Sequence, residues 1–159
     1  MEQKTLAKWL KVIIIGAGIL GLIVYFAIIP AYGISMRTSY PEFSHCFWPW
    51  LIFLWITAVP CYAALVFAWK IAVNIKNDRS FSSENAAHLK VISILAAVDA
   101  AYFFVGNIVL LSFSMSHPGI VLLSLLFVFA GVLISIAAAV VSHLVKKAAV
   151  LQEQSDLTI

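Results

Sequence analysis

The chain carries very little charge for its length. Ten Lys and Arg and seven Asp and Glu residues make up 11% of its 159 positions, whereas 64% of the positions are apolar. Soluble domains are about one quarter charged and about half apolar, so these few charges cannot cover the surface of a globule. The composition excludes a soluble enzyme, a secreted disulfide scaffold and a disordered tail, and it predicts a membrane protein.

Cysteine is also scarce. The two cysteines are Cys46 and Cys61, and Cys61 falls deep inside an apolar stretch, so no disulfide framework is available. The net charge of +3 does not indicate nucleic-acid binding, because the basic residues are interspersed with apolar stretches instead of gathering on one face. We therefore expect no direct contact with nucleic acid.

Four apolar stretches are long enough to cross a bilayer as helices, which takes about 20 residues each. They cover residues 12–31, 48–69, 91–113 and 120–141. No stretch shows the alternation of a lipid-facing β-strand, and the connections are too short to fold on their own. The sequence predicts an all-α polytopic membrane protein, folded as a single four-transmembrane-helix bundle.

The basic residues predict the orientation. Nine of the ten Lys and Arg residues lie in the two tails and in the connection between the second and third spans, and only Arg37 lies on the other side. By the positive-inside rule, both termini are expected in the cytoplasm. The first span has too long an apolar run for a signal peptide and no convincing cleavage site, so it is expected to remain as an anchor.

The first span contains a glycine motif that imitates a nucleotide-binding fingerprint. Gly16, Gly18 and Gly21 match the G-x-G-x-x-G spacing letter for letter. That chemistry needs a strand, a tight turn, a helix and an acidic residue about 20 positions later, and none of these follows. We expect instead that small residues, including the Ala17/Gly21 pair, let a neighbouring helix approach closely. No cofactor is predicted.

Asp99 is the only charged residue well inside a span. An ionised carboxylate at this depth costs on the order of 3 kcal/mol, so the side chain should face other helices and be either protonated or partnered. Two interpretations remain open: a ligand, proton or ion site, or a hydrogen bond that fixes helix packing. The intramembrane polar candidates are Asp99, Asn107, Tyr62 and Ser135, with Tyr62 and Ser135 as candidate bonding partners, and Pro60 is expected to kink the second span.

Outside the spans, four residues have side chains of the types that bind zinc. They are Glu42, His45, Cys46 and His117. Their spacing matches no ligand pattern, and Cys46 and Asp99 lie at different depths, so neither a metal site nor nucleophilic catalysis is predicted. We expect a protein that is not an enzyme.

Two helices are expected to continue into the cytoplasm, over about residues 82–90 and 142–154. Ser82 can cap the first of these extensions, Glu84 lies in its first turn, where the helix dipole favours an acid, and Phe81 can act as a hydrophobic staple. The last residues, 155–159, form a candidate docking peptide.

These segments also resemble a known family. Residues 79–85 (RSFSSEN) and residues 151–159 (LQEQSDLTI) are similar to the matching segments of a YoaS-like family of small bacterial four-span membrane proteins, the domain of unknown function twenty-nine seventy-five. The resemblance implies a bacterial cytoplasmic membrane location and a helix-turn-helix regulator as partner. The family tail more often has a second acid where this chain has Gln154 and Ser155. No catalytic residue is carried over.

The combined hypothesis is a regulatory membrane protein that senses a membrane or small-molecule signal and binds a cytoplasmic helix-turn-helix regulator. The docking candidates are Phe81, Ser82, Glu84, Asn85, Glu153, Asp156, Leu157 and Ile159. The alternative is a small transporter or immunity-type protein with a binding site at the Asp99 level. The expected surroundings are the lipid bilayer, and a second copy of the chain is a further candidate partner.

Overall fold

The computed structural model describes residues 3–156, and they are almost entirely helical. The elements in chain order are α1 (Gln3–Ile23), the π-helix η1 (Val24–Ile28), α2 (Ile29–Ser39), the 3₁₀ helix η2 (Pro41–Cys46), α3 (Phe47–Lys76), α4 (Ser83–Ser112) and α5 (Pro118–Asp156). Four helical segments are long and apolar enough to cross a membrane; three predicted spans lie within one of them each, and the third, 91–113, runs one residue past the end of α4 at Ser112. The all-helical, four-span architecture is confirmed.

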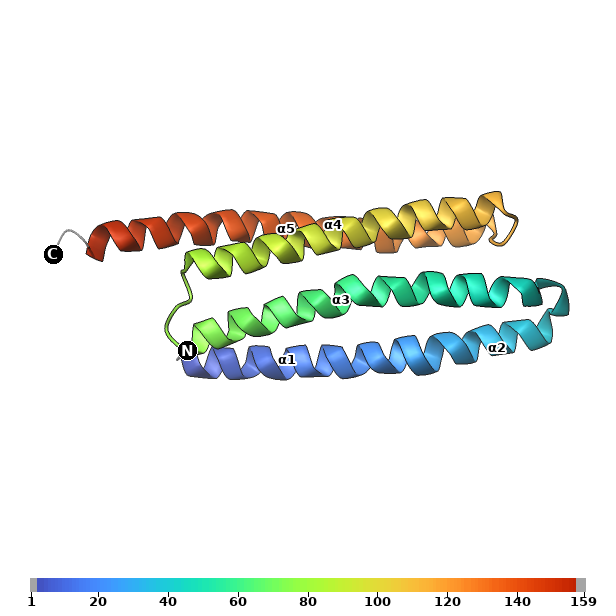
Figure 1. Cartoon of the computed structure of the whole chain (residues 1–159), viewed down its shortest axis with the longest axis horizontal. Helices are drawn as coiled ribbons and strands as arrows, with labels where there is room; N and C mark the ends of the chain where they lie inside the picture. The colour runs from blue at the N-terminus through green and yellow to red at the C-terminus, as the bar shows by residue number, and fades with distance from the viewer. Residues whose placement is uncertain (1–2, 157–159) are drawn as a thin grey trace.

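The spanning segments lie side by side in chain order (Figure 1). Both termini and the α3–α4 connection lie at one end of the molecule, which we call the terminal end. Within residues 3–156, α1 contacts α3, α3 contacts α4 and α4 contacts α5, and no contact joins α1 to α5. The predicted bundle is therefore open along one side.

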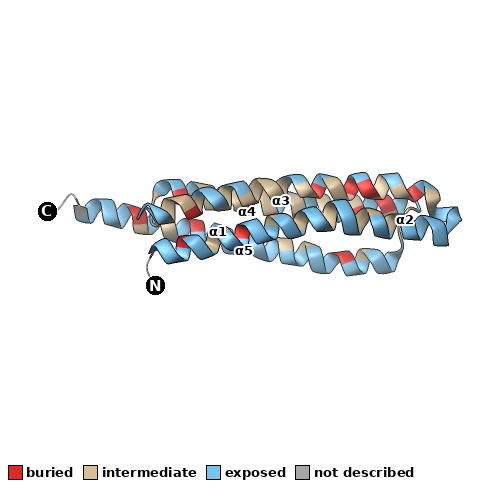
Figure 2. Cartoon of the chain, turned by 90° about the horizontal axis from the view of Figure 1, so that it is seen from below, coloured by how far each residue is buried: buried red, intermediate tan, exposed pale blue. Residues whose placement is uncertain are grey.

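Few side chains are buried in this arrangement (Figure 2). In α1 only Ala7 and Ile14 are buried, and most large apolar side chains of the four segments are exposed. Lipid tails are as apolar as these side chains, so no hydrophobic force in a bilayer would close the bundle. The helices are instead joined by close packing and by a small number of polar contacts.

The π-helix η1 is explained by Pro30. Proline has no N–H, so the backbone carbonyls one turn before it lose their usual donor. The Ile29 N–H bonds the Val24 carbonyl five residues back, and the Trp55 indole N–H donates to the Tyr25 carbonyl at 2.9 Å. The Trp55 side chain thus supplies the Tyr25 carbonyl with the hydrogen bond that the helix backbone does not provide. Such a replacement donor is what allows a helix irregularity inside a membrane. By contrast, α3 stays helical across Pro60.

The helices α3 and α4 both end in a left-handed residue that is not glycine. Asp78 and Ser114 have φ of 56° and 57°. In each case this residue and the next one donate backbone hydrogen bonds to carbonyls of the last helical turn, the pattern of a Schellman motif. The Trp50 indole N–H also donates to the Met115 carbonyl at 2.7 Å, which fixes the α4–α5 turn against α3.

Two glycines of the G-x-G-x-x-G sequence in α1 lie against the side chain of Tyr62. The Tyr62 hydroxyl donates to the Gly18 carbonyl at 2.8 Å, and a Cβ on Gly21 would lie 2.8 Å from that hydroxyl oxygen. The close approach of a neighbouring helix was predicted correctly, but the pair was not: Ala17 is exposed, and Gly18 and Gly21 make the contact. The rotation of a helix that is apolar all round could not be inferred from its sequence.

Candidate functional site

Asp99 lies on the side of α4 that faces α3. The Cys61 thiol donates to Asp99 Oδ2 over 3.6 Å, a distance within the range of bonds to sulfur. The other carboxyl oxygen, Oδ1, is buried and has no hydrogen-bond partner among the described residues. Tyr62 was the residue of the second span expected to bond the acid, but Cys61, one residue earlier, is the one that contacts it.

The polar contacts continue from Cys61 to η1. The Thr57 hydroxyl donates to the Leu54 carbonyl at 2.7 Å, so its single proton is engaged. Tyr25 must then be the donor in the 2.9 Å bond between the Tyr25 and Thr57 hydroxyls. Cys61 follows Thr57 by one turn of α3, on the same side of the helix. We call Tyr25, Thr57, Cys61 and Asp99 the Asp99 cluster; it joins η1, α3 and α4.

The two predicted partners of Asp99 bond elsewhere. Tyr62 bonds the Gly18 carbonyl, as described above, and Ser135 donates to the Ser93 carbonyl at 2.9 Å. Tyr62 thereby joins α3 to α1, and Ser135 joins α5 to α4. Both are helix-to-helix hydrogen bonds of the expected kind. The cluster residues Tyr25 and Thr57 were not predicted, although Thr57 and Cys61, four residues apart on one helix face, gave a usable signal.

Asn107 is separate from this cluster. It lies two turns beyond Asp99 on α4 and is fully buried. Its Nδ2 donates to the Phe103 carbonyl at 2.8 Å within the same helix, and its Oδ1 has no partner among the described residues. Asn107 therefore adds a second buried polar side chain to α4 without joining the Asp99 level.

At the terminal end, two of the predicted docking residues build the α3–α4 connection. Ser82 accepts the backbone N–H of Asn85 at 3.1 Å, so the predicted N-cap is present. Asn85 is 1% exposed; its Nδ2 donates to the carbonyls of Arg79 and Ser80, and its Oδ1 accepts from Asn74 Nδ2 at 2.9 Å. Burial leaves Asn85 no free group for a partner.

The other candidates in this segment are on the surface. Phe81 is 59% exposed, so it packs little as a staple and presents an aromatic face. Glu84 is exposed and lies 3.5 Å from His88 Nε2, one turn later on α4. The Gln3 side-chain amide, in the orientation that its surroundings satisfy, donates to the Ser80 hydroxyl at 3.0 Å and to the Ile75 carbonyl at 3.2 Å, which ties the start of α1 to the same connection. Phe81 and Glu84 are therefore free to meet a partner.

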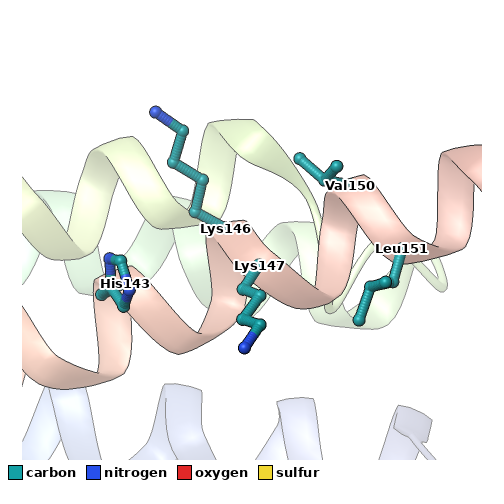
Figure 3. A pocket seen from close by; sticks show the side chains of 5 residues that line it. All are labelled: His143, Lys146, Lys147, Val150 and Leu151. Carbon is teal, nitrogen blue, oxygen red and sulfur yellow. The ribbon is translucent and has the colours of Figure 1, made fainter.

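The last part of α5 extends past the other helices at the terminal end (Figure 1). The Ser142 hydroxyl bonds the Ala86 carbonyl, at 2.6 Å, and Ala149 is 3% exposed, so this part of α5 is packed on one side. On its free side a shallow hollow of about 440 Å³ is lined by His143, Lys146, Lys147, Val150 and Leu151 (Figure 3). Glu153 is exposed. The side chain of Asp156, and all of Leu157 and Ile159, lie outside the described residues.

The residues weighed for zinc lie in two different places. His45 Nε2 is 3.3 Å from Cys46 Sγ, and His45 Nδ1 is 3.1 Å from the Glu42 carbonyl oxygen. His117 instead accepts the Gly119 N–H at the start of α5. In the part of the chain that the structure describes, no three side chains of His, Cys, Asp or Glu are grouped as metal ligands.

Comparison with known proteins gives the family. Residues 31–159 match the model of a family described as "Protein of unknown function (DUF2975)". The chain belongs to this family. It is also 28% identical over 160 residues to "Uncharacterized membrane protein YoaS" of Bacillus subtilis (strain 168), with 99% of each chain covered. No solved structure matches the chain at a significant level. The predicted family is confirmed, and so is the class of membrane protein.

The part that matches the DUF2975 model begins at residue 31, within α2. It includes Thr57, Cys61 and Asp99, the α3–α4 connection and all of α5, whereas Tyr25 lies before it. Both candidate regions of this chain, the Asp99 cluster and the terminal end, thus fall largely within the segment that defines the family.

Proposed function

We propose that this protein is a small regulatory membrane protein that binds a soluble partner at the cytoplasmic face of the membrane. The observation that carries the proposal is the length of α5, which has 39 residues. About 20 residues cross a bilayer, so the remainder, roughly 20 Å or more of helix, stands outside it. A helix maintained that far beyond the bilayer, with one side uncovered, is suited to binding another protein.

The orientation in this proposal comes from charge. The terminal end carries nine of the ten Lys and Arg residues, which assigns it to the cytoplasm. The exposed Phe81 and Glu84 lie at the same end as the α5 extension. The family resemblance implies that the partner is a small helix-turn-helix regulator of transcription, which the protein would hold away from DNA.

The Asp99 cluster provides a place for the signal to act. It lies where η1, α3 and α4 meet, and α4 leads directly from Asp99 to its N-cap Ser82 at the terminal end. A change in protonation or contacts at the cluster would alter the packing of α4 against α3, and α4 would carry that change to the docking residues. The proposal contains no catalytic step, since the cluster has a single acid and no second charged group.

The experiment is a retention assay in cells. A tagged candidate helix-turn-helix regulator, co-expressed with the full chain, should be found in the membrane fraction. It should move to the soluble fraction when residues 152–159 are deleted, because all four spans and Lys146 and Lys147 remain and insertion survives. A deletion variant that retains the regulator, together with an unaffected Phe81→Ala/Glu84→Lys variant, would remove support from this proposal.

A second candidate is a transporter or immunity-type protein that binds its ligand at the Asp99 level. The observation in its favour is the buried Asp99 Oδ1, which has no hydrogen-bond partner in residues 3–156 and belongs to a cluster of side chains from three helical elements. A single acid with no basic counterpart at its level makes a poor pathway for ions. The regulatory proposal therefore comes first.

A further inference from the structure

The basic and the apolar residues that line the hollow on α5 follow one another in a definite order along the helix. The five residues recur at spacings of three and four, so they share one side of the helix. Lys146 and Val150 lie toward one side of the helix, and Lys147 and Leu151 lie toward the other (Figure 3). Along the helix, the basic residues come first after the span and the apolar pair follows further out.

We propose that this hollow binds an acidic amphipathic segment of the soluble partner. The carboxylates of that segment would pair with Lys146 and Lys147, and one apolar side chain would pack between Val150 and Leu151. In the described part of the chain, no carboxylate lies within salt-bridge distance of either lysine. The inference rests on the proposed function, and it specifies the chemistry of the partner's docking segment.

The order of the residues argues against a phospholipid as the occupant. A lipid headgroup lies at the membrane surface, with its apolar chains on the membrane side of its phosphate. In the hollow, the apolar residues Val150 and Leu151 lie on the opposite side of the lysines, further from the span. A lipid phosphate on Lys146 and Lys147 would leave both apolar side chains in water, whereas a peptide from the cytoplasm would cover them.

A second copy of the chain does not fit either. Two copies in one membrane with the same orientation have parallel α5 helices, so the lysines of one copy would face the lysines of the other. The nearest described acid on α5 is Glu153, six residues after Lys147, which is about 9 Å further along the axis. Charge complementarity therefore favours an acidic segment from another protein.

The test uses the full-length protein in nanodiscs of phosphatidylcholine, which carries no net charge. The probe is a fluorescent helical peptide of about four turns with Glu on one face and Leu on the other, and binding is followed by anisotropy. Saturable binding is expected. It should weaken about tenfold or more in Lys146→Glu/Lys147→Glu and also in Val150→Ser/Leu151→Ser.

The matched control is Lys4→Glu/Lys8→Glu, which makes the same charge change at exposed positions of α1 at the same end. It should leave binding within about twofold, since surface charge alone contributes little. Circular dichroism confirms that every variant keeps its helices. Equal loss in the control, or no loss in either hollow variant, would overturn the inference. Phosphatidylglycerol is left out of the nanodiscs, because an anionic surface would repel the Glu-bearing peptide whether or not a lipid occupied the hollow.

The regulator assay separates this inference from the proposed function. If the full chain retains the regulator and the two hollow variants retain it equally well, the hollow is the wrong surface and the proposed function stands. If the full chain does not retain the regulator and the peptide still binds as expected, the hollow remains a binding site and the proposed function is wrong.

Discussion

Asp99 illustrates how one acid is accommodated among apolar helices. Its carboxyl group receives a bond from Cys61, and the neighbouring hydroxyls of Tyr25 and Thr57 extend the polar contacts to a third helical element. Burying an ionisable group without partners in a membrane costs several kcal/mol. The thiol is a weak donor and Oδ1 has no partner among the described residues, so the hydrogen-bonding capacity of the carboxyl group is only partly used.

The first prediction concerns the charge of Asp99. Asp99→Asn keeps an oxygen that can accept from the Cys61 thiol. The variant should fold and insert normally, because Asp99 forms no ion pair among the described residues that the substitution could break. Asp99→Lys places a cation where no acid is available and should lower stability by about 3 kcal/mol. Thermal unfolding in detergent measures both. Normal stability of Asp99→Lys would contradict the inward position of this side chain, and loss of regulation in a stable Asp99→Asn would assign the function to the carboxyl group.

The second prediction concerns the contact between α1 and α3. Gly21→Ala should destabilise by about 1–3 kcal/mol, because the new methyl group would meet the Tyr62 hydroxyl at 2.8 Å. Tyr62→Phe alone should cost about 0.6 kcal/mol for the lost bond to Gly18. In the Tyr62→Phe background the effect of Gly21→Ala should shrink, since the clashing oxygen is gone. A double-mutant cycle measures the coupling.

The control for this cycle is Gly16→Ala. A Cβ on Gly16 would meet nothing within 4 Å, so only helix propensity applies, and the variant should be more stable by roughly 0.5–1 kcal/mol. A destabilising Gly16→Ala, or additive effects in the cycle, would show that α1 is rotated differently.

At the scale of the elements, helix ends and helix faces differ in how well the sequence predicts them. The Ser82 cap and the four spans follow from local signals: a hydroxyl before a helix, and runs of apolar residues of sufficient length. The sides of α3 and α4 that face other helices do not follow from local signals, since both helices are apolar nearly all round. Without a polar stripe, no period marks the inward side. For this reason the depth of Asp99 inside its span was predicted, and the roles of Tyr25, Cys61 and Tyr62 were not.

The third prediction concerns the end of α4. Ser114 adopts a left-handed conformation with φ of 57°, which strains a residue that has a Cβ. Ser114→Gly should therefore stabilise the protein by about 1 kcal/mol. Ser116→Gly, two residues later and without a positive φ, is the matched control and should not stabilise. Thermal unfolding in detergent compares the two; equal shifts would mean that the turn is not strained at Ser114.

At the scale of the whole molecule, the shared end of the two termini and the α3–α4 connection determines what can meet a soluble partner. The fourth prediction is that this end is cytoplasmic. In a Cys46→Ser/Cys61→Ser background, Ser39→Cys should react with a membrane-impermeant maleimide on intact cells, and Ser83→Cys should react only after lysis. Both serines are exposed, so access depends on the side of the membrane. Labelling of Ser83→Cys in intact cells would reverse the topology.

The open side of the bundle has a mechanical consequence. Within residues 3–156, the helices of the α1–α3 hairpin meet those of the α4–α5 hairpin where α3 packs on α4, and the Asp99–Cys61 bond crosses that contact. Because α1 and α5 do not touch, no closed ring of helices resists the lateral pressure of the acyl chains. We therefore expect a change in bilayer tension to turn one hairpin against the other, with the Asp99–Cys61 bond lying across the contact between them.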